Sequence, residues 1–363
     1  MRAIVQDRYG SPEHLRLAEV DAPSLTETGV LVRLHASSIN AGDWRRVRAA
    51  PFIIRASEGW RRPRNPLFGG DAAGVVEAVG SAVTHLRPGD RAYGIRTGSF
   101  AELVNGRSFV RMPANLGFEE AAAMPIAGVT ALQAVREHGR VRPGDRVLVN
   151  GAGGGVGSMV VQIARADGAL VTAVTAPRTL DLVRSLGADR VIDYTNEDFT
   201  RTAGDHDVTI DLGGNRSVRA LRRTLIPGGR LVLVGARAGR LGPVTRLVGG
   251  LIRRRLLRQS VAMFLAAVRI EDLESLTELI EAGKLRPAID RTYPLEEVPA
   301  ALRHVESGKA RGKVVITIDP GAAAGPSSAK FQPQPLQATV RGPDLPASVS
   351  DADEAGLLAE ITP

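Results

Sequence analysis

Residues 146–165, RVLVNGAGGGVGSMVVQIAR, decide the fold of this chain. Arg146–Asn150 is an apolar run typical of a buried parallel strand. Five glycines follow between Gly151 and Gly157, and an apolar run of helix length starts at Met159. A strand, a glycine turn and a helix in this order predict a dinucleotide-binding βα unit, because the glycines let the backbone approach a pyrophosphate at the helix N-terminus.

The literal spacing of the turn is AxGxxG, with Ala152 in the first position. Such a motif is weak by itself, and a glycine-rich loop without a ligand is the alternative. We expect the residues that cradle the pyrophosphate to be Gly153, Gly154, Gly155, Val156 and Gly157.

Strands and helices alternate on the C-terminal side of this unit. Strand-like runs at Leu170–Val174, Val208–Asp211 and Leu231–Val234 are separated by helical segments, and another strand is expected at Val261–Ala266. This βαβα order predicts a doubly wound parallel sheet, so the fold class is α/β.

The N-terminal third has a different pattern. Short β-like runs such as Arg2–Gln6 and Val30–His35 indicate an antiparallel β region. We expect residues 40–66 to be a loop and residues 66–83 to form a turn and a pair of strands. The chain returns to a closing strand at Lys313–Ile318.

Composition narrows the function classes. The absence of cysteine excludes disulfides, thiolate nucleophiles and cysteine metal sites. No signal peptide and no run of about 18 apolar residues is present, so we expect a cytoplasmic protein without a membrane span. The net charge of +8 would suit nucleic acid, anionic lipid or a phosphate-rich cofactor, but its arginines are spread along the chain, which argues against a nucleic-acid partner.

Two further segments stand apart. Residues 241–258 are basic and amphipathic and are compatible with a surface-binding helix, although Gly249 and Gly250 weaken a continuous one. Residues 320–363 are rich in proline, alanine and serine, and we predict a disordered tail there.

Taken in order, nine segments together resemble the medium-chain dehydrogenase/reductase superfamily, and within it the zinc-independent, zeta-crystallin-like NADPH:quinone oxidoreductases. The segments are Ser38-Ile39-Asn40 with Asp43, PLFGGDAAGVVEAVG (66–80), PGDRAYG (88–94), GSFAELV (98–104), PANLGFEEAAAMPIAGVTALQAV (113–135), GAGGGVG (151–157), LGADRVIDY (186–194), GGRLVLVG (228–235) and RGKVVI (311–316).

The resemblance implies two domains. A GroES-like, β-rich substrate domain would be split between residues 1–125 and 268–319, around a Rossmann-type NADPH-binding domain at 126–267. It also implies a cofactor in the cleft between them and a homodimer that pairs along Val261–Ala266.

Zinc-dependent relatives carry a cysteine near position 40 and a His-Glu pair near position 70. This chain has Asn40, Gly70 and Asp71 there, and its six histidines show no ligand spacing. We therefore expect no metal.

The second strand of the parallel sheet ends at Thr175 without a carboxylate, which argues against an NAD ribose site. Thr175 and Arg178 suit a 2′-phosphate, so the expected cofactor is NADPH. The resemblance adds Tyr194 as a wall for the adenosine and Gly235 as a cofactor contact. A solvated Arg178 and a Tyr194 that only packs are the alternatives.

The resemblance also implies roles near the nicotinamide. Asn40 would orient the acceptor or the nicotinamide, Asp43 would hold the loop, and Thr130 would contact the cofactor. An Asn turn, a helix N-cap and a helical threonine bonded to its own backbone are the alternatives. Relatives often have tyrosine where this chain has Arg45, which favours an anionic or polar acceptor.

We therefore predict an NADPH-dependent, zinc-free reductase that transfers hydride to a small molecule, either a quinone or an α,β-unsaturated carbonyl compound (an enone). An enoyl-thioester reductase is one alternative. A noncatalytic protein that binds NADPH or nucleic acid is the other.

Overall fold

A six-stranded parallel sheet forms the centre of the dinucleotide-binding half. The computed structural model describes residues 1–50, 52, 54–234 and 259–318, so Gly235, the basic stretch 241–258 and the tail 320–363 lie outside the described residues. The strand order is β10-β9-β8-β11-β12-β13. Because this order reverses between β8 and β11, a ligand crevice is expected at the carboxyl ends of these strands.

The strands of this sheet are β8 (Arg146–Asn150), β9 (Leu170–Thr175), β10 (Arg190–Asp193), β11 (His206–Asp211), β12 (Leu225–Leu233) and β13 (Ser260–Met263). Its accompanying helices are α4 (Pro125–Leu132), α5 (Gly155–Ala166), α6 (Leu180–Ser185), α7 (Phe199–Thr202) and α8 (Val218–Leu221). The predicted doubly wound sheet is confirmed.

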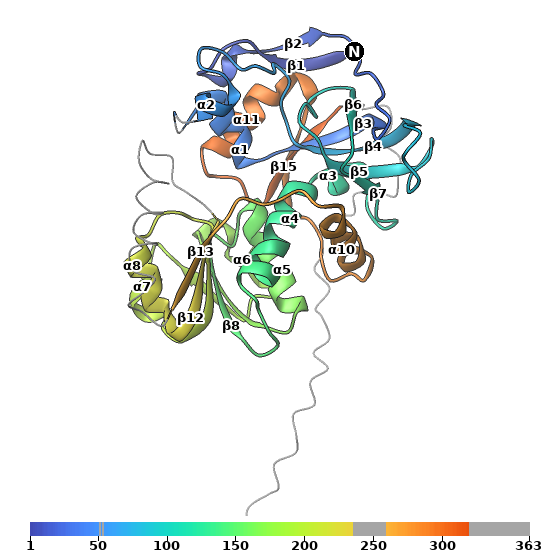
Figure 1. The fold of residues 1–363 in the computed structure, drawn as a ribbon. Helices are drawn as coiled ribbons and strands as arrows, with labels where there is room; N and C mark the ends of the chain where they lie inside the picture. The colour runs from blue at the N-terminus through green and yellow to red at the C-terminus, as the bar shows by residue number, and fades with distance from the viewer. Residues whose placement is uncertain (51, 53, 235–258, 319–363) are drawn as a thin grey trace, which may run out of the picture. The chain divides into compact units, whose positions relative to one another are not determined.

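A second, seven-stranded sheet joins the two ends of the chain. Its order is β14-β15-β3-β4-β5-β7, and β6 also pairs with β3. The orange β15 lies against the blue β3 in Figure 1, and the two strands pair antiparallel. A segment after residue 310 therefore completes a sheet begun before residue 40, whereas the predicted domain boundaries stay a prediction.

The strands outside the parallel sheet are β1 (Arg2–Gln6) and β2 (Leu15–Glu19), which pair with each other, and β3 (Val30–Ile39), β4 (Asp71–Val79), β5 (Arg91–Ile95), β6 (Leu103–Gly106), β7 (Phe109–Arg111), β14 (Ile289–Pro294) and β15 (Lys313–Thr317). The remaining helices are α1 (Ala41–Arg48), α2 (Ile54–Glu58), α3 (Phe118–Ala122), α10 (Ile270–Glu281) and α11 (Val298–Glu306). No helix within the described ranges has the length and apolar character needed to span a membrane.

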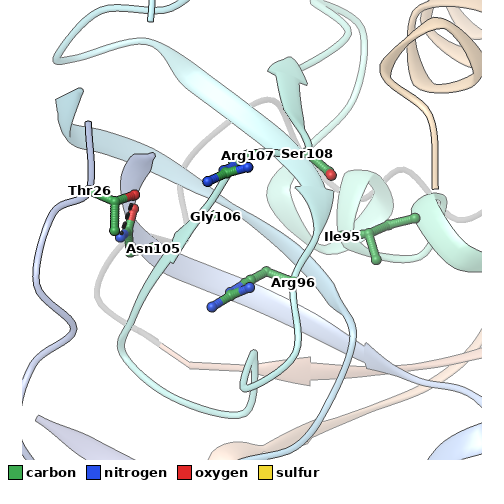
Figure 2. A pocket seen from close by; sticks show the side chains of 7 residues that line it. All are labelled: Thr26, Ile95, Arg96, Asn105, Gly106, Arg107 and Ser108. Atoms are coloured by element: carbon green, nitrogen blue, oxygen red, sulfur yellow. Dashed lines mark hydrogen bonds between the residues drawn. The ribbon is translucent and has the colours of Figure 1, made fainter. Parts of the chain in front are cut away.

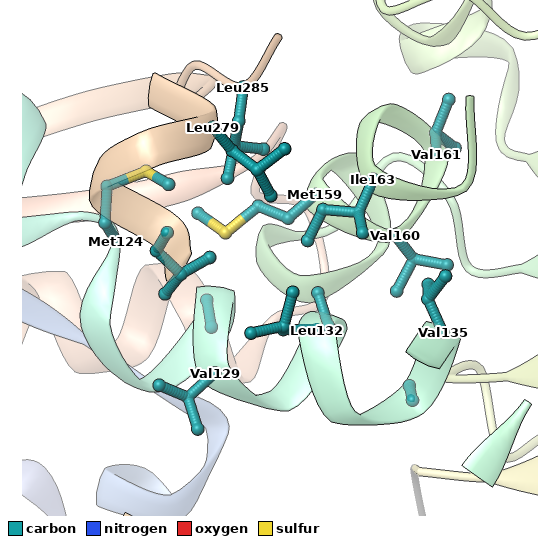
Figure 3. Close-up of a cluster of buried hydrophobic side chains, with 14 of the residues drawn as sticks. Met124, Val129, Leu132, Val135, Met159, Val160, Val161, Ile163, Leu279 and Leu285 are labelled. Carbon is teal, nitrogen blue, oxygen red and sulfur yellow. The ribbon is translucent and has the colours of Figure 1, made fainter. Parts of the chain in front are cut away.

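One apolar core connects the two sheets through helices. Met159 and Ile163 of α5 lie one helical turn apart and are fully buried, with Leu132 and Leu279 in the same cluster (Figure 3). A Cβ on Gly128 of α4 would lie 2.7 Å from the side chain of Leu276. The packing of α4 on α10 is therefore close.

Three details differ from the sequence predictions. Residues 40–66 contain α1 and α2, because Asn40 caps α1 and Val47 anchors it in the core despite its arginines. Residues 66–83 hold one long strand, β4, in which Gly74 marks a close approach to β3 instead of a turn. The strand expected at Val261–Ala266 is Ser260–Met263.

Candidate active site

A cleft of about 550 Å³ lies at the carboxyl ends of β8, β9 and β11. Its other walls are the first residues of α1, part of α4 and the segment 308–314. The predicted site residues that line it are Asn40, Thr130, Gly153, Gly154, Gly155, Val156, Gly157, Thr175, Arg178 and Tyr194. Asp43 is not part of this lining.

The glycine turn forms the floor of the cleft at the N-terminus of α5. Gly151 has a φ of +89°, and a Cβ on Gly157 would lie 2.1 Å from the carbonyl oxygen of Gly151. A Cβ on Gly154, the N-cap of α5, would meet only that carbonyl, at 3.5 Å. Ala152 is fully buried, so its methyl group stays out of the cleft. The turn thus presents bare backbone and a helix N-terminus, which fit a pyrophosphate.

The far end of the cleft carries Arg178 and Thr175. Arg178 donates to the carbonyl oxygen of Gly308 and also lines the cleft. The Thr175 hydroxyl lies 2.6 Å from that of Thr179, which donates to the carbonyl oxygen of Ala176. The Thr175 proton is therefore directed to Thr179, and Arg178 is the better donor for a 2′-phosphate.

The charge of the lining is positive. Arg45 and Arg178 are among the lining residues, whereas the charge of Lys313 is paired with Asp71, and the described part of the lining contains no aspartate or glutamate. A cleft of this kind attracts a phosphate-rich ligand.

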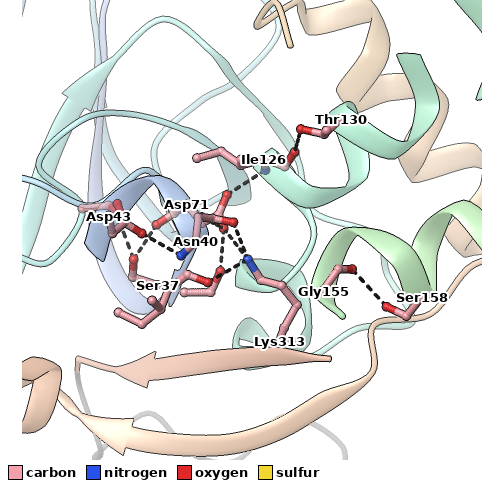
Figure 4. Close-up of polar contacts among 12 residues, drawn as sticks. Ser37, Asn40, Asp43, Asp71, Ile126, Thr130, Gly155, Ser158 and Lys313 are labelled. Carbon is pink, nitrogen blue, oxygen red and sulfur yellow. Dashed lines mark hydrogen bonds and ion pairs between the residues drawn. The ribbon is translucent and has the colours of Figure 1, made fainter. Parts of the chain in front are cut away.

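Asn40 begins α1 and is held at both backbone and side chain. Its backbone N–H donates to Asp43 Oδ2 at 2.7 Å. Its Nδ2 donates to Asp71 Oδ2 at 2.7 Å, and its Oδ1 accepts from Lys313 Nζ at 2.7 Å. Figure 4 shows these contacts beside the start of α5. The structure therefore combines a helix cap with a fixed amide that lines the cleft.

Asp43 is buried behind Asn40. Burial raises the pKa of its carboxyl to about 7, and the nearby Asp71 adds to this rise, whereas the hydrogen bond from the Asn40 backbone opposes it. Asp43 accepts its hydrogen bond at the start of α1, and its role as a residue that holds the loop stays a prediction.

Sequence reasoning did not identify Asp71 and Lys313 as site residues. Their ion pair has an Nζ–Oδ2 distance of 3.1 Å, and the side chains are 0% and 3% exposed, respectively. The sequence comparison gives Asp71 only as the residue that stands where zinc-dependent relatives have a zinc ligand. One signal was available: Lys313 is one of four lysines in an arginine-rich chain and starts a buried strand, where its charge requires a partner.

Thr130 is bonded to the backbone of its own helix, as in the alternative interpretation of this residue. Its hydroxyl donates to the carbonyl oxygen of Ile126 at 2.6 Å, as Figure 4 shows, while the residue still lines the cleft. Its oxygen can therefore accept, but its proton is engaged.

A second cavity of about 410 Å³ lies beside the last residues of β5 and β6 in the other sheet (Figure 2). Arg96, Asn105 and Arg107 line it, and none of the predicted site residues does. Across the described ranges, no group of three or more His, Cys, Asp or Glu side chains could hold a metal ion.

Comparisons with known proteins agree with this arrangement. Residues 26–133 match the alcohol dehydrogenase GroES-like domain, and residues 186–316 match the zinc-binding dehydrogenase family. The chain is 33% identical to the 2-methylene-furan-3-one reductase of Solanum lycopersicum over 87% of its own length and 79% of that protein. It is 32% identical to the mitochondrial NAD(P)H oxidoreductase RTN4IP1 of Mus musculus, covering 88% and 89%.

Among solved structures, the quinone oxidoreductase from Coxiella burnetii superposes with a TM-score of 0.77 at 28% identity. The match covers 88% of this chain and 99% of that one. The similarity therefore extends over both sheets and the cleft.

The substitution Asp43→Asn tests the burial of this carboxyl. An acid whose pKa is higher in the folded than in the unfolded protein binds more protons when folded, so its contribution to stability falls as pH rises. The ordinary pKa of the carboxyl is 3.8 and its pKa in the folded protein is about 7. The stability contribution therefore falls as pH rises between these two values and is lost above the higher one. We expect wild type, but not the variant, to lose about 1 kcal/mol or more of unfolding free energy there, since one pKa unit is about 1.4 kcal/mol.

Urea unfolding at about pH 5 and about pH 8 measures this difference. Asp181→Asn is the matched control, because the side chain of Asp181 is 100% exposed. Identical pH dependence in wild type and in the Asp43 variant would contradict the burial effect.

Proposed function

We propose that this chain, which belongs to the medium-chain dehydrogenase/reductase superfamily and to its quinone oxidoreductase-like members, is an NADPH-dependent reductase of quinones or enones. The observation that carries the proposal is that the glycine turn and the fixed Asn40 amide line one cleft, whose described walls contain no aspartate or glutamate. The relatives named as an NAD(P)H oxidoreductase, a 2-methylene-furan-3-one reductase and a quinone oxidoreductase support it.

The residues present fit the cofactor. Gly153 to Gly157 and the N-terminus of α5 would hold the pyrophosphate, and Arg178 would hold the 2′-phosphate. When bound, NADPH supplies a hydride to the acceptor. Tyr194, which is 38% exposed and lines the cleft, would cover the adenosine.

Asn40 is the proposed catalytic residue. A quinone or enone oxygen gains negative charge as the compound is reduced, and an N–H held in place beforehand stabilises that charge without reorganisation. Asn40 Nδ2 has two hydrogens, of which one is given to Asp71. The other has no partner among the residues that the structure describes, so it can donate to the acceptor oxygen, and solvent supplies the final proton.

Arg45 supports a preference for anionic or polar acceptors. It belongs to α1, five residues after Asn40, and lines the same cleft. Burial lowers the pKa of its guanidinium, so bringing an anionic group of the acceptor near it would offset the loss of solvent.

The direct test combines binding and turnover. Purified protein should be stabilised by NADPH in a thermal melt and should oxidise NADPH with members of a panel of quinones and enones, anionic ones included. Absence of both effects would contradict the proposal. Enoyl thioesters in the same panel separate the thioester alternative, and NADPH or RNA binding without any turnover would favour the noncatalytic one.

The substitution Arg178→Ala tests cofactor choice. A hydrogen bond to a charged group contributes about 1.5–3 kcal/mol, so we expect the NADPH-over-NADH ratio of kcat/KM to fall by roughly 10- to 100-fold. Thr175→Ala is the control, with a change below about 3-fold, because its hydroxyl proton is directed to Thr179. Unchanged discrimination in Arg178→Ala would show that the 2′-phosphate site lies elsewhere.

The sheet edge supports a homodimer. In the described part of the chain, β13 pairs only with β12, and the apolar Leu265 just beyond it is 96% exposed. An unpaired edge strand is a template for another chain. We expect a dimer mass in light scattering and a monomer after Ala262→Pro, since proline removes a ladder donor. A monomeric wild type would contradict this assembly.

A further inference from the structure

The ion pair between Lys313 and Asp71 has no obvious role in cofactor binding, yet it lies directly behind Asn40. Lys313 Nζ donates to three acceptors: the carbonyl oxygen of Ile39 at 3.2 Å, Asn40 Oδ1 at 2.7 Å and Asp71 Oδ2 at 3.1 Å. An ammonium group has three N–H bonds. Each of them is therefore used within the protein, and Lys313 has none to offer a substrate.

Asp71 is equally occupied. Its Oδ2 accepts from Ser38 Oγ at 2.5 Å, from Asn40 Nδ2 at 2.7 Å and from Lys313. Its Oδ1 accepts the backbone N–H of Ile126, at the start of α4, at 2.7 Å. Both oxygens of the carboxylate are therefore occupied by donors from the protein. Neither member of the pair is placed to transfer a proton.

Both contacts of the pair converge on the Asn40 amide. Lys313 donates to the amide oxygen, and Asp71 accepts from the amide nitrogen. The two ends of this planar group are therefore held by partners of opposite charge. This arrangement distinguishes the oxygen from the nitrogen by charge. Rotation of the amide by half a turn would place its NH₂ against the lysine and its oxygen against the carboxylate.

A cation on the amide oxygen also changes the amide nitrogen. Hydrogen bonds in a chain polarise one another, so the charged donor at Oδ1 makes the remaining Nδ2–H a stronger donor. The stem of Lys313 also reaches the cofactor side, because a Cβ on Gly155 would lie 2.8 Å from its Cδ. A β-bridge between Gly154 and Gly312 holds the same segment against the glycine turn.

We propose that Lys313 and Asp71 are positioning residues that lock the Asn40 amide and strengthen its free N–H toward the oxygen of a quinone or enone acceptor. The assignment rests on the proposed function. It predicts that the pair affects turnover through Asn40 and leaves NADPH binding to the glycine turn and Arg178.

The main variant is Asp71→Asn with Lys313→Met. Replacing a buried ion pair by neutral groups of similar size costs little stability, whereas removing one partner leaves an unpaired charge. We expect a folded protein with a lowered melting temperature, because asparagine has one acceptor oxygen where both oxygens of Asp71 accept. We also expect an NADPH Kd from fluorescence within about 3-fold, and a kcat lower by about 100-fold, because a small misplacement of a catalytic group has that effect. Lys309→Met, four residues before Lys313 and exposed, is the matched control and should keep wild-type kcat.

Asn40→Ala completes the cycle. If the pair acts through Asn40, the triple variant should be no slower than Asn40→Ala alone, within about 3-fold. Losses that multiply in the triple variant, or a double variant with wild-type kcat, would overturn the proposal. If the double variant does not fold, Lys313→Arg keeps the charge but not the ammonium geometry, and it should still lower kcat by about 10-fold; wild-type kcat there would overturn the proposal.

A crystal structure of the double variant, or of Lys313→Arg if the double variant does not fold, separates this proposal from the proposed function. We expect the Asn40 side chain to leave its wild-type rotamer, and an unchanged rotamer would overturn the positioning role. A wild-type protein that neither binds NADPH nor reduces any acceptor would instead overturn the proposed function.

Discussion

The buried carboxylate of Asp71 is the constraint on which the site depends. It has no exposed surface, so its charge requires partners from the protein. The partners come from the end of β3, the start of α4 and the start of β15. Removing Lys313 alone would leave an uncompensated buried charge, at a cost of about 3–5 kcal/mol. Three elements distant in sequence are thus tied to one point at the side of the cleft.

The glycine turn is the corresponding constraint on the cofactor side. Gly157 can only be glycine while the turn keeps its close contact with Gly151, and the backbone of Gly154 bridges to Gly312. The residue after Gly312 is Lys313, so the cradle and the ion pair meet within one short segment. The packing of α4, α5 and α10 in one core supports α4 and α5, which both contribute to the walls of the cleft.

The features predictable from sequence are those encoded locally. The glycine turn at Gly151–Gly157 and the lack of a carboxylate after Thr175 can both be read from neighbouring residues. The glycine turn and Thr175 line the cleft. The pairing of Asp71 with Lys313 spans 242 residues and depends on tertiary structure, so no local pattern reports it. The bond from Thr175 to Thr179 spans only four residues, and their spacing in TAPRT was a usable signal. Helix α1 was missed because its arginines obscure the apolar side that Val47 anchors.

The two carboxylates near Asn40 hold other residues of the site in place and are not offered to a substrate. Asp71 has a cation beside it, whereas Asp43 has a backbone N–H and a burial that raises its pKa to about 7. Asp43 is kept from the cleft lining, and Asp71 has its oxygens occupied. The described walls of the cleft therefore offer donors and cations without a free base. Such a site suits a reaction in which charge grows on an acceptor oxygen and is met by a fixed N–H, and it suits proton abstraction poorly.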